Sequence, residues 1–269
     1  MKMSKRLGWL AMALLAVIVC LVLQLAGSII GVLIMEGSLN EAAIAKATGF
    51  ATLFAHILTM LGFAIWYRFG CGGPTLKDVK GVFAPKTILA VVLITVGLCF
   101  LTRFVLLALE PIVPSVQNFM DMAFNQTKLG TDIMATAAAV LAGPIGEELV
   151  FRGVAFYYAK KMVSDLANRK KAFWIANVLQ ALLFGGLHLN IVQSTYAFVI
   201  GLAVGYLAHR YRSIVPAIAE HILFNMLATF LWNPLGMALP QNYVVYIIGA
   251  VICFAAVMAG LHFSRATKD

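Results

Sequence analysis

Long apolar runs separated by short polar segments dominate the pattern of this chain. A helix needs about 20 consecutive, mainly apolar residues to cross the hydrocarbon core of a bilayer. The pattern therefore predicts an all-α fold, a polytopic membrane bundle of about eight transmembrane helices. The predicted spans cover residues 8–35, 47–67, 87–109, 133–158, 172–189, 191–209, 214–231 and 242–264.

The connections between these runs differ in character. The first run follows a basic hexapeptide and is longer than the ~7–15-residue core of a signal peptide, so we interpret it as a retained span. Residues 110–132 mix prolines and acidic residues with scattered large apolar side chains. That mixture predicts an interfacial, partly helical loop. Residues 188–190 leave room only for a very short turn between the fifth and sixth spans.

Composition supports a membrane protein and excludes a nucleic-acid binder. Hydrophobic residues make up 62% of the 269, and charged residues only 12%, at a mean hydropathy of +0.93. A soluble domain carries about a quarter charged residues. The net charge of +9 comes from short basic blocks between apolar runs, so we expect membrane lipid, and no nucleic acid, as a partner.

The basic blocks also orient the helices. With the N-terminus inside, 17 of the 20 Lys and Arg lie on the inner side, Lys46 and Lys128 lie outside, and Arg103 lies within the third span. The positive-inside rule then predicts cytoplasmic N- and C-termini in a multi-pass protein of the cell membrane. No internal repeat interrupts the chain, so 1–269 is predicted to be a single membrane domain. The four cysteines lack the close spacing of a metal site or a disulfide framework.

Ionisable residues at membrane depth are costly and therefore indicate function, and most of them lie in the second half of the chain. In the first cluster, Glu148 and Arg152 are i,i+4 neighbours that can pair. Glu147 projects about 100° away from Glu148 on a helix and remains free for acid–base chemistry. The preceding Gly143-Pro144 is expected to loosen or kink the helix.

Two further clusters follow along the chain. Phe184 and His188 lie one turn apart on one helix face, and the glycines between them allow a neighbouring helix to approach. His221 and Asn225 are again one turn apart, so both side chains point at the same place. Two such donors can hold a developing oxyanion, or they can help to hold a metal.

Each of these residues also has a structural interpretation. A lone buried histidine is usually a hydrogen-bonded packing residue, which we favour for His56, and we favour packing for Arg103 too. The Glu148–Arg152 pair is interpreted as structural support, and Glu220 either orients His221 or faces a water-filled cavity. Residues 1–130 and 242–264 are interpreted mainly as scaffold. For four other intramembrane polar groups we favour a catalytic role, because burying all of them in three apolar helices for packing alone would cost much free energy. They are Glu147, His188, His221 and Asn225.

The three clusters together resemble the CAAX protease and bacteriocin-processing family, also called the Abi family. Its pattern is EExxxR, then FxxxH, then HxxxN, each on its own transmembrane helix. This chain has Glu147-Glu148-Leu149-Val150-Phe151-Arg152, Phe184-Gly185-Gly186-Leu187-His188 and His221-Ile222-Leu223-Phe224-Asn225. The resemblance covers residues 143–225.

The resemblance implies an intramembrane endopeptidase that cleaves a membrane-associated, possibly lipidated, CAAX-like peptide; family members of eukaryotes remove the last three residues of prenylated proteins. Glu147 and His188 would activate water, and His221 and Asn225 would stabilise the oxyanion. Glu148 and Arg152 would support Glu147. A metal-free route without cofactors is favoured, because HExxH is absent and Asn is a poor zinc ligand. The alternative is a zinc ion held by Glu147, His188 and His221.

Two other function classes are compatible with the same residues. Buried Glu and His also serve as proton relays in ion-coupled transporters, although the absence of inverted repeats disfavours most transporter folds. A non-catalytic immunity or scaffold protein is the other alternative. One feature conflicts with a single site: counted at ~1.5 Å per residue from the cytoplasmic ends, His221, Glu147 and His188 lie at depths of ~10, ~16 and ~24 Å. Convergence then requires the fifth span to start deeper, tilt or break at Gly185-Gly186.

Overall fold

The computed structural model describes residues 1–34, 41–73, 82–122, 130 and 132–265, and these residues form helices without any strand. Most helices are α-helices, and three short segments (η1, η4, η5) are π-helical. In chain order they are α1 (Met3–Ile34), α2 (Glu41–Ile65), η1 (Trp66–Gly70), α3 (Pro85–Leu109), α4 (Pro114–Asp121), α5 (Ile133–Ala137), η4 (Ala138–Ala142), α6 (Gly143–Glu148), η5 (Leu149–Ala155), α7 (Phe156–Met162), α8 (Arg169–Leu187), α9 (Ile191–Arg210), α10 (Val215–Ala238) and α11 (Tyr243–Arg265).

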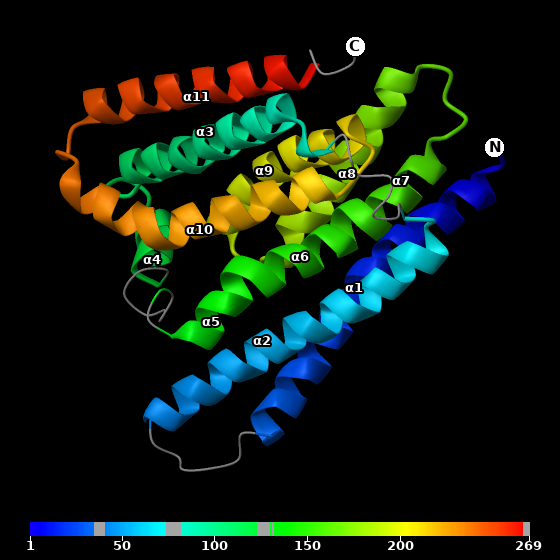
Figure 1. The fold of residues 1–269 in the computed structure, drawn as a ribbon, viewed down its shortest axis with the longest axis horizontal. Coiled ribbons are helices and arrows are strands. Elements are labelled where there is room, and N and C mark those ends of the chain that lie inside the picture. The colour runs from blue at the N-terminus through cyan, green and yellow to red at the C-terminus, as the bar shows by residue number, and fades with distance from the viewer. Residues whose placement is uncertain (35–40, 74–81, 123–129, 131, 266–269) are drawn as a thin grey trace.

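Figure 1 shows how the helices are layered. The α3–α11 pair forms one flank and the α1–α2 pair forms the other, with α10 and the long rod from α5 to α7 between them. Helices α8 and α9 pack against each other, and both contact η5. Large apolar side chains of α1 and α11 face outward, as expected for helices that border lipid.

The all-α polytopic prediction is confirmed, and the protein is a multi-pass integral membrane protein. Among the described residues, seven helical stretches are long and apolar enough to cross a membrane. The fifth predicted span, 172–189, is the helix α8, but it falls outside that set. Its first turn is Arg169-Lys170-Lys171, and Asn177 and Gln180 lie buried in its middle, so its mean hydropathy is too low.

The start of α1 and the end of α11 lie at the same end of the bundle (Figure 1). Two contacts tie the basic segments together there: Arg6 Nη2 lies 2.7 Å from Asp165 Oδ2, and Arg210 Nε donates to the Ser264 carbonyl at 2.8 Å. Hydrogen bonds from the Met1 ammonium and then from Arg6 lower the pKa of Asp165 to about 2. The cytoplasmic location of this end stays a prediction.

The predicted interfacial loop 110–132 contains the short helix α4, so its partly helical character is confirmed. Three of its apolar residues, however, face the protein core instead of an interface. Val116, Phe119 and Met120 are buried in the same core as α9, and the Phe119 ring packs edge-on against Tyr196 at 6.0 Å. Residues 123–129 and 131 of this loop lie outside the described residues.

The rod from α5 to α7 deviates from a regular α-helix beside Pro144, where the sequence predicts a loosened helix. The Gly143 N–H donates to the carbonyl of Ala138, five residues back, and the proline has no N–H to donate. The carbonyl of Ala139, which Gly143 would bind in a regular α-helix, is thereby released. The predicted loosening takes the form of a π-helical turn, η4.

The short turn between the fifth and sixth predicted spans is present between α8 and α9. Leu189 adopts a positive φ of 53°, and the Asn190 side chain caps α9 by accepting hydrogen bonds from the backbone N–H groups of Val192 and Gln193. A Cβ on Gly185 would lie 2.7 Å from the Ser194 carbonyl oxygen, so the expected close approach of a neighbouring helix occurs at this glycine. The turn leaves His188 at the very end of α8.

Candidate active site

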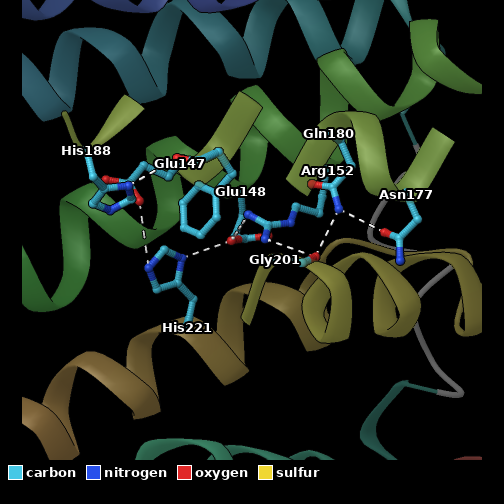
Figure 2. Close-up of polar contacts among 9 residues, drawn as sticks. Glu147, Glu148, Arg152, Asn177, Gln180, His188, Gly201 and His221 are labelled. Carbon is cyan, nitrogen blue, oxygen red and sulfur yellow. Dashed lines mark hydrogen bonds and ion pairs between the residues drawn. The ribbon is translucent and has the colours of Figure 1, made fainter. Parts of the chain in front are cut away.

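His221 on α10 lies between the two adjacent carboxylates of α6. Its Nδ1 is 2.9 Å from Glu148 Oε1, and its Nε2 is 3.7 Å from Glu147 Oε2. Figure 2 shows this arrangement, with Arg152 on the far side of Glu148. Because an ionised carboxylate only accepts hydrogen bonds, the ring nitrogen Nδ1 donates to Glu148. The other nitrogen, Nε2, is thereby directed at Glu147.

Glu148 and Arg152 form a fully buried ion pair. Arg152 Nη1 donates to Glu148 Oε1 at 2.8 Å, and both side chains are 0% exposed. The spacing i,i+4 predicts this contact. The sequence does not predict that the same oxygen, Oε1, also receives the hydrogen bond of His221. Glu148 therefore couples the arginine of its own helix to the histidine of α10.

A network of amides on α8 supports the arginine from the other side. Arg152 Nη2 donates to the Gly201 carbonyl at 3.4 Å, and Gln180 Nε2 donates to the same oxygen at 2.9 Å. Gln180 Nε2 also donates to Asn177 Oδ1, and Asn177 Nδ2 donates to the Leu202 carbonyl. The polar residues that lower the hydropathy of α8 thus fix it to α9 (Figure 2).

The Phe184 ring links the three predicted clusters. It packs edge-on against His188 at 5.2 Å and against His221 at 5.6 Å between ring centroids. The Arg152 guanidinium carbon lies 4.3 Å from its centroid, a cation–π contact. Phe184 is 2% exposed, so it forms an apolar wall behind the polar groups.

His188 has a defined tautomer at the end of α8. Its Nδ1 lies 3.0 Å from the Phe184 carbonyl oxygen, which can only accept, so Nδ1 carries the hydrogen. In the neutral ring, Nε2 then has a free lone pair. This is the form in which a histidine acts as a base.

Asn225 lies one turn after His221 and reaches the rod at η4. Its Nδ2 donates to the Ala139 carbonyl at 2.8 Å, the oxygen that the π-helical turn releases. One of the two amide hydrogens is used in this bond, and the second is left for another acceptor. The helix irregularity and the position of Asn225 therefore depend on each other.

Exposure separates the two glutamates. The Glu147 side chain is 16% exposed, whereas that of Glu148 is fully buried. Glu147 is thus the carboxylate that water can reach. This matches the sequence interpretation that it is the free member of the pair.

The depth conflict does not hold in the structure. Glu147 and His221 approach to 3.7 Å, and His188 is joined to them through Phe184. A break at Gly185-Gly186 is excluded, because α8 is continuous through both glycines. The depth count assumed helices of equal inclination, whereas Figure 1 shows α8 inclined to α10.

The described residues contain no group of three His, Cys, Asp or Glu side chains arranged to hold a metal ion. The alternative of a zinc ion held by Glu147, His188 and His221 stays a prediction. The chemistry derived below uses only the side chains of the chain.

Two groups near the site, His56 and Glu220, are not assigned to it from the sequence. His56, interpreted as a packing residue, lies beside Gly143 in the rod from α5 to α7. Glu220 is fully buried, and neither of its carboxylate oxygens has a hydrogen-bond partner among the described residues. Nothing in the sequence distinguishes His56 from an ordinary core histidine, because its contact with α6 joins helices far apart along the chain.

Comparison with known protein families supports the predicted resemblance. Residues 129–227 match the family described as type II CAAX prenyl endopeptidase Rce1-like. The predicted family resemblance is confirmed over this segment. This Rce1-like segment begins just before α5 and ends two residues after Asn225, so it holds every residue of the three motifs. Searches of curated proteins and of solved structures give no match. Residues 129–227 thus have the character of a CAAX-type intramembrane protease.

Proposed function

We propose that this protein hydrolyses a peptide bond near the C-terminus of a membrane-associated, prenylated CAAX-like peptide, at the cytoplasmic face of the cell membrane. The observation that supports this most is the position of His221 between the buried, arginine-paired Glu148 and the accessible Glu147. Burying an ion pair costs free energy that good geometry and additional hydrogen bonds must offset. Here the additional bond comes from His221, and it orients that histidine towards the second, accessible carboxylate.

In the proposed reaction, the Glu147 carboxylate takes a proton from water while the water oxygen attacks the scissile carbonyl carbon. His188, with its Nε2 lone pair, helps to hold that water. The Nε2–H of protonated His221 and the second amide hydrogen of Asn225 stabilise the oxyanion of the tetrahedral intermediate. The C–N bond then breaks, and the proton held by Glu147 passes to the leaving amine.

The test is cleavage of a prenylated CAAX peptide by the purified protein in detergent micelles, with the released tripeptide measured by mass spectrometry. Glu147→Ala and His188→Ala are expected to lose activity by several orders of magnitude, on the scale of about 10²–10⁴ for each acid–base group. Matched controls are Glu110→Gln, at the end of α3, and His262→Ala on α11. Activity of Glu147→Ala close to that of the unchanged protein would overturn the proposal.

Two further arms sharpen the assay. The same peptide without its prenyl group shows whether the lipid is required for recognition. A strong chelator added to the unchanged protein addresses the metal question, and the proposed route predicts no loss of activity.

A further inference from the structure

Helix α2 crosses the rod from α5 to α7 at two glycines, Gly143 and Gly146. A Cβ added to Gly146 would lie 3.6 Å from the His56 carbonyl oxygen and 3.7 Å from the Met60 nitrogen. A Cβ added to Gly143 would lie 3.4 Å from His56 Cε1 and 3.6 Å from His56 Nδ1. The two helices therefore approach closely, and the Nδ1–Cε1 edge of the imidazole faces the start of α6.

The face of α6 that His56 borders also carries Glu147. Gly143 and Glu147 are four residues apart, which places them one turn apart on the same side of a helix. His56 thus stands on the α2 side of Glu147, while His221 contacts Glu147 from α10.

The ring nitrogen on this edge of His56 is not used by the surrounding fold. His56 Nδ1 is buried and has no hydrogen-bond partner among the described residues. In contrast, Nδ1 of His188 and Nδ1 of His221 each have one. A buried polar atom without a partner costs about 1–3 kcal/mol and calls for an explanation.

We propose that His56 is a positioning residue for the catalytic carboxylate: its Nδ1–H hydrogen-bonds Glu147 from the α2 side during hydrolysis. This inference rests on the proposed function. The first half of the chain then supplies part of the active site, beyond the Rce1-like segment 129–227. This bond from the α2 side holds the carboxylate in one orientation towards water while His221 stabilises the oxyanion.

Substitutions at position 56 distinguish positioning from packing. An Asn side chain places its amide where Nδ1 lies, Gln places it where Nε2 lies, and Leu has no polar atom. We expect His56→Leu and His56→Gln to lower kcat for the prenylated peptide by about 10²-fold with KM changed less than about twofold, because misplacing a reacting group has that cost. His56→Asn is expected to restore kcat to within about tenfold of the unchanged protein.

The matched control is Thr59→Val in the same helix crossing. Thr59 is buried and, within the described part of the chain, bonds only its own helix, at the Ala55 carbonyl; its methyl group faces Gly146. This variant should keep its kcat. Thermal unfolding in the same detergent is measured for every variant, so that activity is compared per folded molecule.

The outcomes separate the inference from the proposed function. If Glu147→Ala is inactive while Leu, Gln and Asn at position 56 all keep the kcat of the unchanged protein, the positioning role is wrong and the peptidase mechanism stands. Equal losses of kcat in all three variants would also overturn it, since packing alone would then explain them. If Glu147→Ala keeps full activity, the proposed function itself fails.

Discussion

The α3–α11 pair and the polar cluster around His221 are assembled by different forces. Between α3 and α11 the backbones nearly touch: a Cβ on Gly97 would lie 2.7 Å from the Cys253 carbonyl oxygen, and one on Gly260 would lie 2.9 Å from the Ala90 carbonyl oxygen. Such pairing depends on the fit of small residues, because lipid gives helices no hydrophobic reason to associate. Around His221 the helices are joined by an ion pair and directional hydrogen bonds.

This difference implies that stability and activity are separable. Substitutions in the α3–α11 pair should destabilise the bundle without changing the activity of molecules that still fold. Substitutions in the polar cluster around His221 should lower both stability and activity. Four substitutions test this division.

The largest effect is expected for Arg152→Met, which removes the guanidinium that pairs with the buried Glu148. Leaving one member of a buried pair uncompensated costs about 3–5 kcal/mol, and His221 also loses its fixed partner. We expect a much lower thermal midpoint in detergent and no peptide cleavage. Arg152→Lys keeps the charge and should lie between the two. An Arg152→Met protein as stable as the unchanged one would contradict the division.

The next effect is expected for Asn225→Ala, which removes the donor to the Ala139 carbonyl and the proposed oxyanion donor. Loss of one oxyanion donor lowers kcat by about 10²–10³-fold. Asn225→Asp, equal in size but unable to donate when ionised, should be similarly slow. Steady-state kinetics on the prenylated peptide measure this, and a change confined to the thermal midpoint would assign Asn225 to structure alone.

A smaller effect is expected in the flank for Gly97→Ala. The added methyl would collide with the backbone of α11, and overpacking of this kind costs about 1–3 kcal/mol. Activity per folded molecule should be unchanged. Gly8→Ala on α1 is the control, since nothing lies within 4 Å of its added methyl group. Reduced kcat in Gly97→Ala would show that the flank is coupled to the site.

The smallest effect is expected for Asp165→Asn, at the basic end of the bundle. The hydrogen bonds from the Met1 ammonium and Arg6 lower the pKa of Asp165 from 3.8 to about 2. A carboxyl group whose pKa is lower in the folded state stabilises the fold above its ordinary pKa and loses this effect as pH falls. The thermal midpoints of the two proteins should differ slightly near neutral pH and coincide near pH 2. A constant difference across this range would exclude the ion pair as its cause.

Local pattern was sufficient to predict the helices and the three motifs. Every predicted span coincides with a helix, because apolar runs of this length have few other structures in a membrane. The i,i+4 spacing of Glu148 and Arg152 correctly predicts their contact. Of the predicted spans, α8 alone falls outside the seven stretches that are apolar enough to cross a membrane, because buried amides interrupt it.

Contacts between distant helices could not be predicted in the same way. The bond from His221 to Glu148 joins residues 73 positions apart, and the one from Asn225 to Ala139 joins residues 86 apart. The depth count failed because it treated the helices as equally inclined. His56 was interpreted as a packing residue because a lone buried histidine usually is one, and nothing in the sequence places it beside α6.

The π-helical turn η4 has a consequence for how this chain tolerates changes in length. A π-helical turn contains one residue more than the α-helical turn it replaces. Each residue of a helix corresponds to a rotation of about 100° around the helix axis. A chain shortened by one residue within Ala138–Ala142 would make the bond from Gly143 to the Ala138 carbonyl a regular α-helical one. The next carbonyl would still face Pro144, which has no N–H to donate. The deletion would also turn the segment before Pro144 relative to Glu147 and displace the acceptor of Asn225. The extra residue therefore sets the relative orientation of the two parts of the rod.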